Sequence, residues 1–341
     1  MEPALASTTS PDPSSRPLQL PFAFSGNGLE YFRIWLVNVA LTILTLGVYS
    51  AWAKVRTNRY FWRHTHLDAA SFDYVANPVA ILKGRMLVLA FLLGWVVLSG
   101  IFPPADAFFS VLVLVLLPWA VVRSASFRAR NTTYRNLRFD FLGEYRDALV
   151  AYVLLPACLP FTLGLVYPAM IRAQRAFVFG KSAYGIQPFD FQAPLGDFYR
   201  LYAGLFGLLI LLVALALLLG ATISAPAALV AGVLALLLLG ARMNADLLNL
   251  VFHSTSLGPH RFRSGLRAGE LLLLYVGNTL GILATLGLFI PWARVRTARY
   301  RLEHLALLPV GDLDAFVAGQ VDAVGSLGDE VADLFDLDLG L

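Results

Sequence analysis

Polar side chains recur at matching places in three otherwise apolar segments of the chain. Asn38 and Asn278 each lie near the middle of such a segment. The tripeptide Thr-Leu-Gly places a threonine in each segment, at Thr45, Thr162 and Thr285. Amide and hydroxyl groups do no covalent chemistry unaided, but they donate and accept hydrogen bonds where water is absent. The pattern therefore indicates binding or passage of a polar group at membrane depth.

Two interpretations of these five residues are open. In the first, they line an intramembrane polar path between repeats, as broken helices do in transporters. In the second, they satisfy backbone groups that a helix break leaves free, or they join neighbouring helices. The residue types favour the second interpretation without excluding the first.

Basic side chains follow the three segments at about the same register. The arginine pairs are Arg56/Arg59, Arg172/Arg175 and Arg296/Arg299. Such clusters next to a membrane are candidate contacts for anionic lipid headgroups or for a phosphorylated ligand. The alternative, which we prefer, is that these charges only fix the orientation of the chain in the membrane.

Other residue patterns in the chain lack the spacing or the number of residues that a phosphate-binding loop, a zinc site or a disulfide requires. Gly180-Lys181-Ser182 looks like the end of a phosphate-binding loop, but Arg175 stands where that loop needs its first glycine. The five histidines lack the i, i+4 spacing of a helical zinc site, and the single cysteine, Cys158, excludes an intrachain disulfide. We therefore expect no enzymatic activity, no metal and no cofactor.

The elements that hold the polar residues must lie in a membrane. Of the 341 residues, 58% are hydrophobic and 14% charged, against roughly 45–50% and about 25% in soluble domains. Seven apolar segments are long enough, or nearly so, to cross roughly 30 Å of hydrocarbon. They are approximately residues 31–53, 86–102, 107–122, 148–171, 201–220, 226–241 and 271–293.

The chain also contains an internal repeat. Residues 52–57 (Trp-Ala-Lys-Val-Arg-Thr) match residues 292–297 (Trp-Ala-Arg-Val-Arg-Thr), and Phe72-Asp73-Tyr74 resembles residues 189–191 in a middle copy. The pattern predicts two and a half units. The expected divisions are a disordered N-terminal arm (1–20), repeat 1 (21–138), repeat 2 (139–261), half repeat 3 (262–308) and an acidic C-terminal tail (309–341).

The positions of the charges select a topology. Segments 31–53, 148–171 and 271–293 have bases near both ends, whereas the turns 103–106 and 221–225 have none. Because basic residues stay on the cytoplasmic side, we expect the three Thr-Leu-Gly segments to re-enter and the other four to span as two hairpins. The alternative is seven spans with inverted units.

We therefore expect an all-α polytopic membrane protein. Each repeat would combine a broken, re-entrant helix with a helical hairpin. Short Phe-x-Phe strands would lie on the cytoplasmic face, either paired as a small sheet or unpaired as interfacial anchors.

The C-terminal tail is acidic and has apolar residues at helical spacing. Residues 310–341 contain eight acids and no base. Anionic lipid would repel such a helix. The tail is expected either to dock on the chain's own basic loops or on a partner, or to remain solvated.

Several long motifs resemble the YjgN family of bacterial inner-membrane proteins. They include Phe-Ser-Gly-Asn-Gly-Leu-Glu-Tyr-Phe at 24–32, Leu-Thr-Leu-Gly-Val-Tyr-Ser-Ala-Trp-Ala-Lys-Val-Arg at 44–56, and residues 130–135 and 253–262. The similarity covers roughly residues 20–308. It implies a multi-pass protein of the bacterial inner membrane. It implies no catalytic residues, because the family has no established activity.

The repeats, the broken segments and the buried Asn and Thr together predict transport or permeation of a small solute or lipid. The competing hypothesis is a non-transporting scaffold or envelope accessory protein that recruits partners through its cytoplasmic face and acidic tail. The expected partner is the bilayer, including anionic headgroups. Nucleic acid is not expected, because the bases flank apolar segments.

Overall fold

The computed structural model describes residues 19–324. Five copies of one unit follow each other along this part of the chain: a five-residue strand, a pair of helical segments and a shorter strand. Of the predicted N-terminal arm (1–20), only residues 19 and 20 are among the described residues. Of the predicted C-terminal tail (309–341), residues 325–341 lie outside them.

The described residues form ten antiparallel strands that close into a barrel. The five-residue strands are β1 (Leu20–Phe24), β3 (Ala70–Tyr74), β5 (Leu137–Phe141), β7 (Gln187–Phe191) and β9 (His260–Ser264). They alternate with β2 (Thr65–Leu67), β4 (Thr132–Tyr134), β6 (Ser182–Tyr184), β8 (Thr255–Leu257) and β10 (Leu305–Leu308). Pairing of β1 with β10 joins the first unit to the last.

The prediction of an all-α fold is wrong, because this barrel is closed and strand-built. The Phe-x-Phe segments are strands, but the sequence pattern missed the shorter strands that follow each helical pair. Three or four residues are too few for a visible alternation of apolar and polar side chains. These short strands give every long strand a partner on both sides, and closure leaves no unpaired sheet edge.

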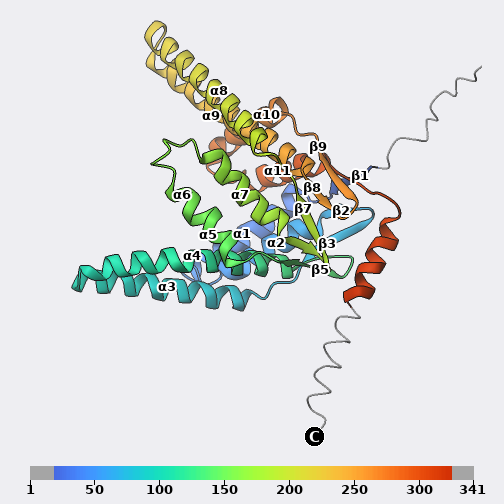
Figure 1. Ribbon diagram of the computed structural model, residues 1–341. Coiled ribbons are helices and arrows are strands. Elements are labelled where there is room, and N and C mark those ends of the chain that lie inside the picture. Colours follow the sequence, from blue (N-terminus) through green and yellow to red (C-terminus); the bar gives the residue numbers. More distant parts are fainter. Residues whose placement is uncertain (1–18, 325–341) are drawn as a thin grey trace, which may run out of the picture.

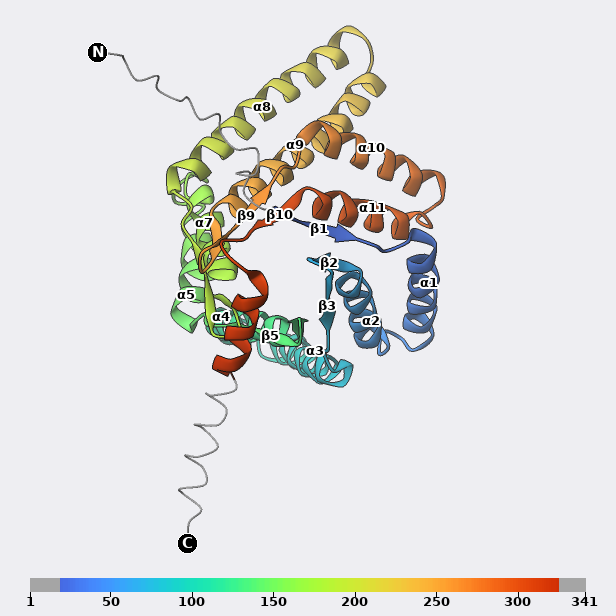
Figure 2. The same ribbon diagram turned by 90° about the vertical axis from the view of Figure 1, so that its right-hand side faces the viewer.

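The turns between strands and the helical pairs leave the barrel at opposite ends. Two-residue turns join each short strand to the next long one. Asp68-Ala69 and Arg135-Asn136 adopt φ values of 46–63° there, as type I′ hairpin turns require. Figure 1 shows the strands on one side and the long helices projecting to the other. In Figure 2 the helical pairs surround the strands.

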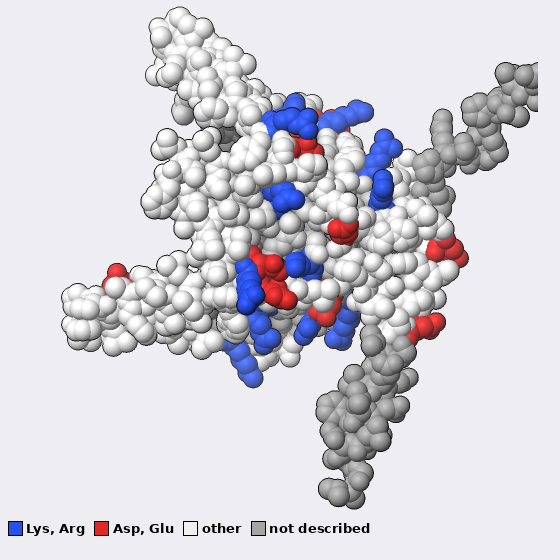
Figure 3. Space-filling model, in the orientation of Figure 1, with Lys and Arg blue, Asp and Glu red and all other residues white. Residues whose placement is uncertain are grey.

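Within the described residues, four helices are long and apolar enough to cross a membrane. They are α3 (Pro78–Ile101), α4 (Pro104–Arg130), α8 (Leu195–Thr222) and α9 (Ala225–His253). At about 1.5 Å per residue they are roughly 36–44 Å long, more than the hydrocarbon thickness of about 30 Å. They form two hairpin arms that are nearly free of charge in Figure 3. These are the four segments that the charge pattern assigns to spans.

The other three units contain shorter helices that reverse at Thr-Leu-Gly. Their elements are α1 (Gly28–Leu44) and α2 (Ser50–Arg63); α5 (Tyr145–Leu149), the π-helical η2 (Val150–Leu154), α6 (Leu155–Ala157) and α7 (Tyr167–Gly180); and α10 (Ala268–Ala284) and α11 (Ile290–Glu303). The helices α1 and α10 are about 26 Å long, less than the hydrocarbon thickness of about 30 Å. Both ends of each pair join the barrel, the geometry that re-entry of these segments requires; their re-entry into the membrane remains a prediction.

At each reversal, a threonine hydroxyl forms hydrogen bonds to the end of one helix and the start of the next. The Thr45 hydroxyl donates to the Leu41 carbonyl (2.7 Å) and accepts the Tyr49 amide (2.9 Å). Thr162 and Thr285 make the same pair of contacts at their own reversals. The hydroxyl therefore satisfies a carbonyl at the end of one helix and an amide at the start of the next.

The next two residues form the tip of each reversal. The leucine, at 46, 163 or 286, has a φ of 48–50° and a side chain at least 93% exposed. The glycine that follows has a φ of 83–96°, a conformation that residues with a Cβ avoid. Other large apolar side chains beside these leucines are exposed too, among them Leu44, Phe161 and Leu283, as expected of a tip inserted in lipid.

Gly47→Ala is expected to lower the free energy of unfolding by about 1–2 kcal/mol. Gly47 has a φ of +92° and open space around it, so the cost is backbone strain alone. Gly84→Ala is the matched control, because it lies in α3 with open space and a helical φ. There the alanine should stabilise by about 0.5–1 kcal/mol. Thermal unfolding in detergent tests this pair, and shifts of the same sign would contradict it.

The main hydrophobic core lies inside the barrel. The middle residue of each five-residue strand is a phenylalanine directed into it: Phe22, Phe72, Phe139, Phe189 and Phe262. Successive rings around this girdle stack at centroid distances of 6.1–6.4 Å. Stacked rings add stabilisation beyond the area that they bury.

A helix formed by residues 313–324 covers the turn end of the barrel. Leu313 and Val317 are buried in the same cluster as the barrel core, and Phe316 packs against it. Asp314 forms an ion pair with Arg135 in the β4–β5 turn. The beginning of the acidic tail thus contributes to the core.

His260 makes the docking of this helix sensitive to pH. Its Nδ1 accepts the Val310 amide (3.1 Å), and its ring meets Phe316 edge to face at 4.5 Å. Burial lowers the pKa of His260. Because the docked state binds the proton more weakly than the undocked state, docking is strongest above pH of about 6.5 and weakens as the pH falls below it.

The measurement is the mobility of a nitroxide at Ala318, which is exposed on the helix, in a Cys158→Ala background. Mobility should rise between pH 7.5 and about 5.5. His260→Asn keeps an acceptor but has no proton to gain, so its mobility should stay constant. An equal rise in both proteins would assign the effect to other groups.

Candidate functional site

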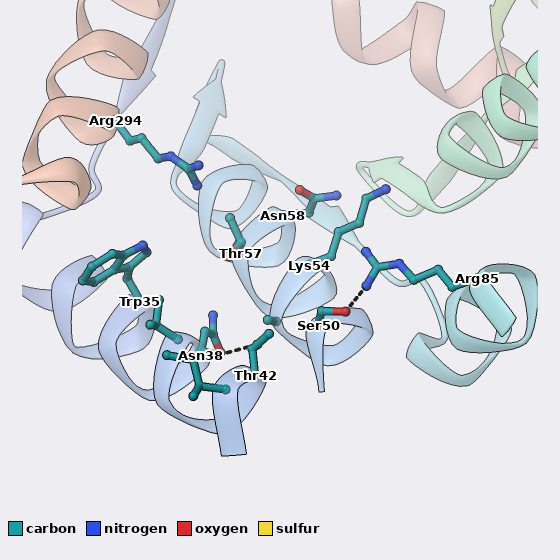
Figure 4. Close-up of a pocket in the computed structure, with 12 residues that line it drawn as sticks. Trp35, Asn38, Thr42, Ser50, Lys54, Thr57, Asn58, Arg85 and Arg294 are labelled. Carbon is teal, nitrogen blue, oxygen red and sulfur yellow. Dashed lines mark hydrogen bonds between the residues drawn. The ribbon is translucent and has the colours of Figure 1, made fainter. Parts of the chain in front are cut away.

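Polar side chains from four helices surround a pocket of about 460 Å³ beside the first reversal (Figure 4). It is lined by Trp35, Asn38, Val39, Thr42 and Ile43 of α1, Ser50, Ala53, Lys54, Thr57 and Asn58 of α2, Arg85 of α3 and Arg294 of α11. We call it the Asn38 pocket. None of these lining residues, all within the described part of the chain, is acidic.

Three cations line the Asn38 pocket, each from a different helix. Arg85 donates to the Ser50 hydroxyl, and Arg294 donates to the Tyr31 phenol at 3.2 Å. Lys54 has no hydrogen bond or ion pair within residues 19–324. Charges that approach the hydrocarbon region without a counter-charge are costly. An anion bound among them would provide that counter-charge.

Asn38 is the least exposed polar group of this pocket. Its side chain is 5% exposed, and neither its Nδ2 nor its Oδ1 has a partner in the described structure. The bond that Figure 4 draws at this residue runs from the Thr42 hydroxyl to the Asn38 backbone carbonyl (2.6 Å). A buried amide without partners costs about 1–3 kcal/mol. A ligand in the pocket would recover that cost.

An equivalent pocket of about 500 Å³ surrounds Asn278 between α10 and α11. Asn278 differs from its counterpart, because its Nδ2 donates to the Thr297 hydroxyl (3.2 Å) and the Ala293 carbonyl (3.4 Å). Arg294 lines both pockets, and Arg301 adds a second cation to this one. The two pockets are therefore neighbours that share a cation.

The threonines predicted to line a polar path lie elsewhere. Thr45, Thr162 and Thr285 are at the reversals, where their hydroxyls bind the backbone. Neither pocket includes any of them. The structure instead brings Thr42 and Thr57 together with Asn38.

Three of the six predicted arginines join neighbouring units. Arg59 donates to the Tyr74 carbonyl (3.2 Å), Arg172 to the Ala193 carbonyl (2.7 Å) and Arg299 to the Gly26 carbonyl (2.8 Å). Each acceptor lies at or just beyond the end of the long strand in the following unit, counting unit one as following unit five. These arginines thus position the helical pairs around the barrel.

The other three predicted arginines lie outside both pockets. Arg175 has a buried Nε without a partner in the described structure, whereas Arg56 and Arg296 are exposed. The prediction missed all three cations of the Asn38 pocket, Lys54, Arg85 and Arg294, as site residues. A signal for Lys54 was present, because it aligns with Arg294 in the internal repeat.

Leucine at the two equivalent asparagines should have opposite effects on stability. Asn38→Leu removes an amide without partners and should leave the free energy of unfolding unchanged or raise it by about 1 kcal/mol. Asn278→Leu removes two hydrogen bonds and should lower it by about 1–2 kcal/mol. Denaturant titration in detergent measures both. An equal loss in the two variants would show that Asn38 has a partner inside the protein.

Comparison with known proteins places the chain among bacterial membrane proteins. A model of the family "Bacterial protein of unknown function (DUF898)" matches residues 19–334. Inner membrane protein YjgN of Salmonella typhimurium is 29% identical over 144 residues, which are 42% of this chain and 36% of that protein. The Escherichia coli K12 protein of the same name is 27% identical over 147 residues, or 43% and 37%. No solved structure matches the chain.

These alignments span little more than a third of the length of the relatives. Their names and the four apolar helices agree on the location, and the chain is a multi-pass protein of the inner membrane. The resemblance to the YjgN family is confirmed. Because the family match extends over most of the chain, the protein belongs to the family of bacterial proteins of unknown function termed DUF898.

Proposed function

We propose that the protein binds the phosphate of an anionic membrane lipid in the Asn38 pocket and assists passage of the headgroup through the inner membrane. The observation that carries the proposal is that Lys54, Arg85 and Arg294 all line one pocket that has no acidic lining residue. Ionisable residues near membrane depth mark ligand pathways by default. No covalent step is part of this function.

The chemistry of the lining residues fits a phosphate. Guanidinium groups match phosphate oxygens in pairs, and an ammonium group adds a point charge. The free amide of Asn38 and that of Asn58, which also lines the pocket, supply neutral donors. The pocket volume of about 460 Å³ falls in the usual range of small-ligand sites, about 300–1,000 Å³.

The neighbouring pocket offers the headgroup a second site beside the first. A headgroup that leaves the interface loses its hydration, and an unpaired charge in hydrocarbon is strongly unfavourable. Arg294 lines both pockets, so a phosphate can pass from one to the other without leaving this cation. The lipid chains would remain in the bilayer during this passage.

The test uses purified full-length protein in vesicles with fluorescent phosphatidylglycerol in one leaflet. Exchange between leaflets, measured by chemical quenching of the outer label, should be faster than in protein-free vesicles. Unchanged exchange would reject permeation. Uptake of inorganic phosphate without lipid exchange would assign the pockets to a free anion instead.

A further inference from the structure

The lumen of the barrel holds a cavity of about 430 Å³ that differs chemically from the Asn38 and Asn278 pockets. Protein cores contain few voids larger than a water molecule. A space of this size in a core is therefore a candidate binding site. Apolar cavities of smaller volume remain dry and take up apolar molecules. This cavity lies among the strands, apart from the Asn38 pocket between the helices.

The wall of the lumen is apolar. The phenylalanine girdle forms its middle, and Leu67, Leu257 and Leu307 lie directly beside Phe22, Phe189 and Phe262 on the paired short strands. The two tyrosines of the wall use their hydroxyls on the backbone, since Tyr134 donates to the Leu67 carbonyl (2.8 Å) and Tyr184 to the Tyr134 carbonyl (3.1 Å). Burial raises the pKa of both tyrosines, so both remain neutral.

The remaining hydroxyls of the wall are also occupied. Thr65, Ser182 and Thr255 each donate to the carbonyl four residues earlier, at 2.7–2.8 Å. Every hydroxyl that lines the lumen therefore already donates to a backbone carbonyl. A polar ligand would find few partners here, whereas a hydrocarbon chain would bury its surface at about 25 cal/mol per Å².

The two ends of the lumen differ. At the end where the helical pairs leave, it is bounded by Trp62 of α2, Phe252 of α9 and Leu302 of α11, each in the last turns of a helix. At the turn end it is covered by Leu313 and Phe316 of the 313–324 helix. The 313–324 helix thus covers the turn end of the lumen, whereas the helix end is bounded by large apolar side chains and by threonine and serine hydroxyls that are already bonded to the backbone.

We propose that the lumen binds one hydrocarbon chain of a membrane lipid, which inserts from the helix end and is stopped by the 313–324 helix. The membrane is the source of the chain because the helices that bound this end continue into it. The proposal does not depend on the function proposed for the Asn38 pocket.

Photocrosslinking from inside the lumen tests the proposal. A benzophenone amino acid replaces Phe189, which faces the lumen, or Asp190, which is exposed on the outside of the same strand. The full chain is irradiated in its membrane, and the adducts are identified by mass spectrometry. A phospholipid adduct at 189 and none at 190 is expected. A crosslink from 189 only to the chain's own residues, a free fatty acid adduct, or equal lipid adducts at both positions would overturn the proposal.

Filling the lumen gives a second, quantitative test. Leu257→Trp adds volume inside the barrel, whereas Ser256→Trp adds the same group at the neighbouring position that points away from the core in β8. Native mass spectrometry of the purified proteins should show about tenfold less bound lipid for Leu257→Trp at unchanged thermal stability, and no change for Ser256→Trp. Equal occupancy in both variants would contradict a chain in the lumen.

A third variant separates this proposal from the function proposed above. Lys54→Gln alters only the Asn38 pocket and should leave the lumen lipid in place. Loss of the phospholipid adduct at position 189 in Lys54→Gln would contradict two independent sites.

Discussion

Replacing Lys54, Arg85 and Arg294 together by glutamine is expected to abolish binding of the anionic lipid headgroup. Glutamine keeps a donor and removes the charge. A hydrogen bond to a charged group contributes about 1.5–3 kcal/mol, so each single replacement should weaken binding roughly ten- to hundredfold. In the proposed complex the three cations share one phosphate, so their effects should couple. The triple variant should fall below detection in a titration with short-chain phosphatidylglycerol.

The chain offers a matched control for this experiment. Arg56 and Arg296 lie on the same two helices as Lys54 and Arg294 but line neither pocket. Arg56→Gln with Arg296→Gln removes two charges from the same region and should change affinity less than about twofold, because neither group lines the pocket and both act on a bound phosphate only through a field that salt screens. Equal losses in the two sets would mean that the total charge, and not the pocket, attracts lipid.

Phe316→Asp is expected to release the 313–324 helix from the barrel. Phe316 is partly buried against the core cluster at the barrel mouth, so its burial contributes part of the about 1.5–3 kcal/mol of a fully buried side chain. A carboxylate in its place would need to leave water for an apolar surface, which adds several kcal/mol more. The sum exceeds what the remaining contacts of a short helix can offset.

The release is measured by thiol labelling inside the lumen. A cysteine at Leu257, in a Cys158→Ala background, should react with a membrane-impermeant reagent at least about a hundredfold faster in Phe316→Asp, in line with the lost docking energy. Ala315→Asp adds the same charge at an exposed position of the helix and should have little effect. Fast labelling without either substitution would mean that the mouth is already open.

The strands show which parts of the fold a local sequence pattern can predict. The alternation around Phe72 or Phe189 extends over five residues and predicts a strand. The segment Thr255–Leu257 is too short to show the same pattern, so its strand was missed. Closure of the barrel depends on β1 pairing with β10, elements from opposite ends of the described chain. No local pattern contains that information.

The arginines show why the site was predicted only in part. On α2, Lys54, Thr57 and Asn58 line the pocket, and their i, i+3, i+4 spacing puts them on one helical face. Arg56 and Arg59 lie on a different face, where Arg59 binds the next unit. Counting bases after each segment ignores this helical phase. A phase analysis of the repeat would have selected Lys54.

The asparagines show what the internal repeat alone does not predict. The repeat identifies Asn38 and Asn278 as equivalent, and the structure places both in pockets. Yet Asn278 bonds to Thr297 whereas Asn38 makes no bond to Thr57, although the residue types correspond. Differences of this kind arise from small displacements of helices and cannot be read from identical residues.

The most direct test of the account is to map where a lipid headgroup sits. Phosphatidylglycerol with a photoreactive headgroup is irradiated with the full-length protein, and the modified residues are identified by peptide mass spectrometry. The account predicts modification of residues 35–58 and of the region around Arg294, with both lost when Lys54 and Arg294 become glutamine. Modification confined to other regions, or unchanged by those substitutions, would contradict it.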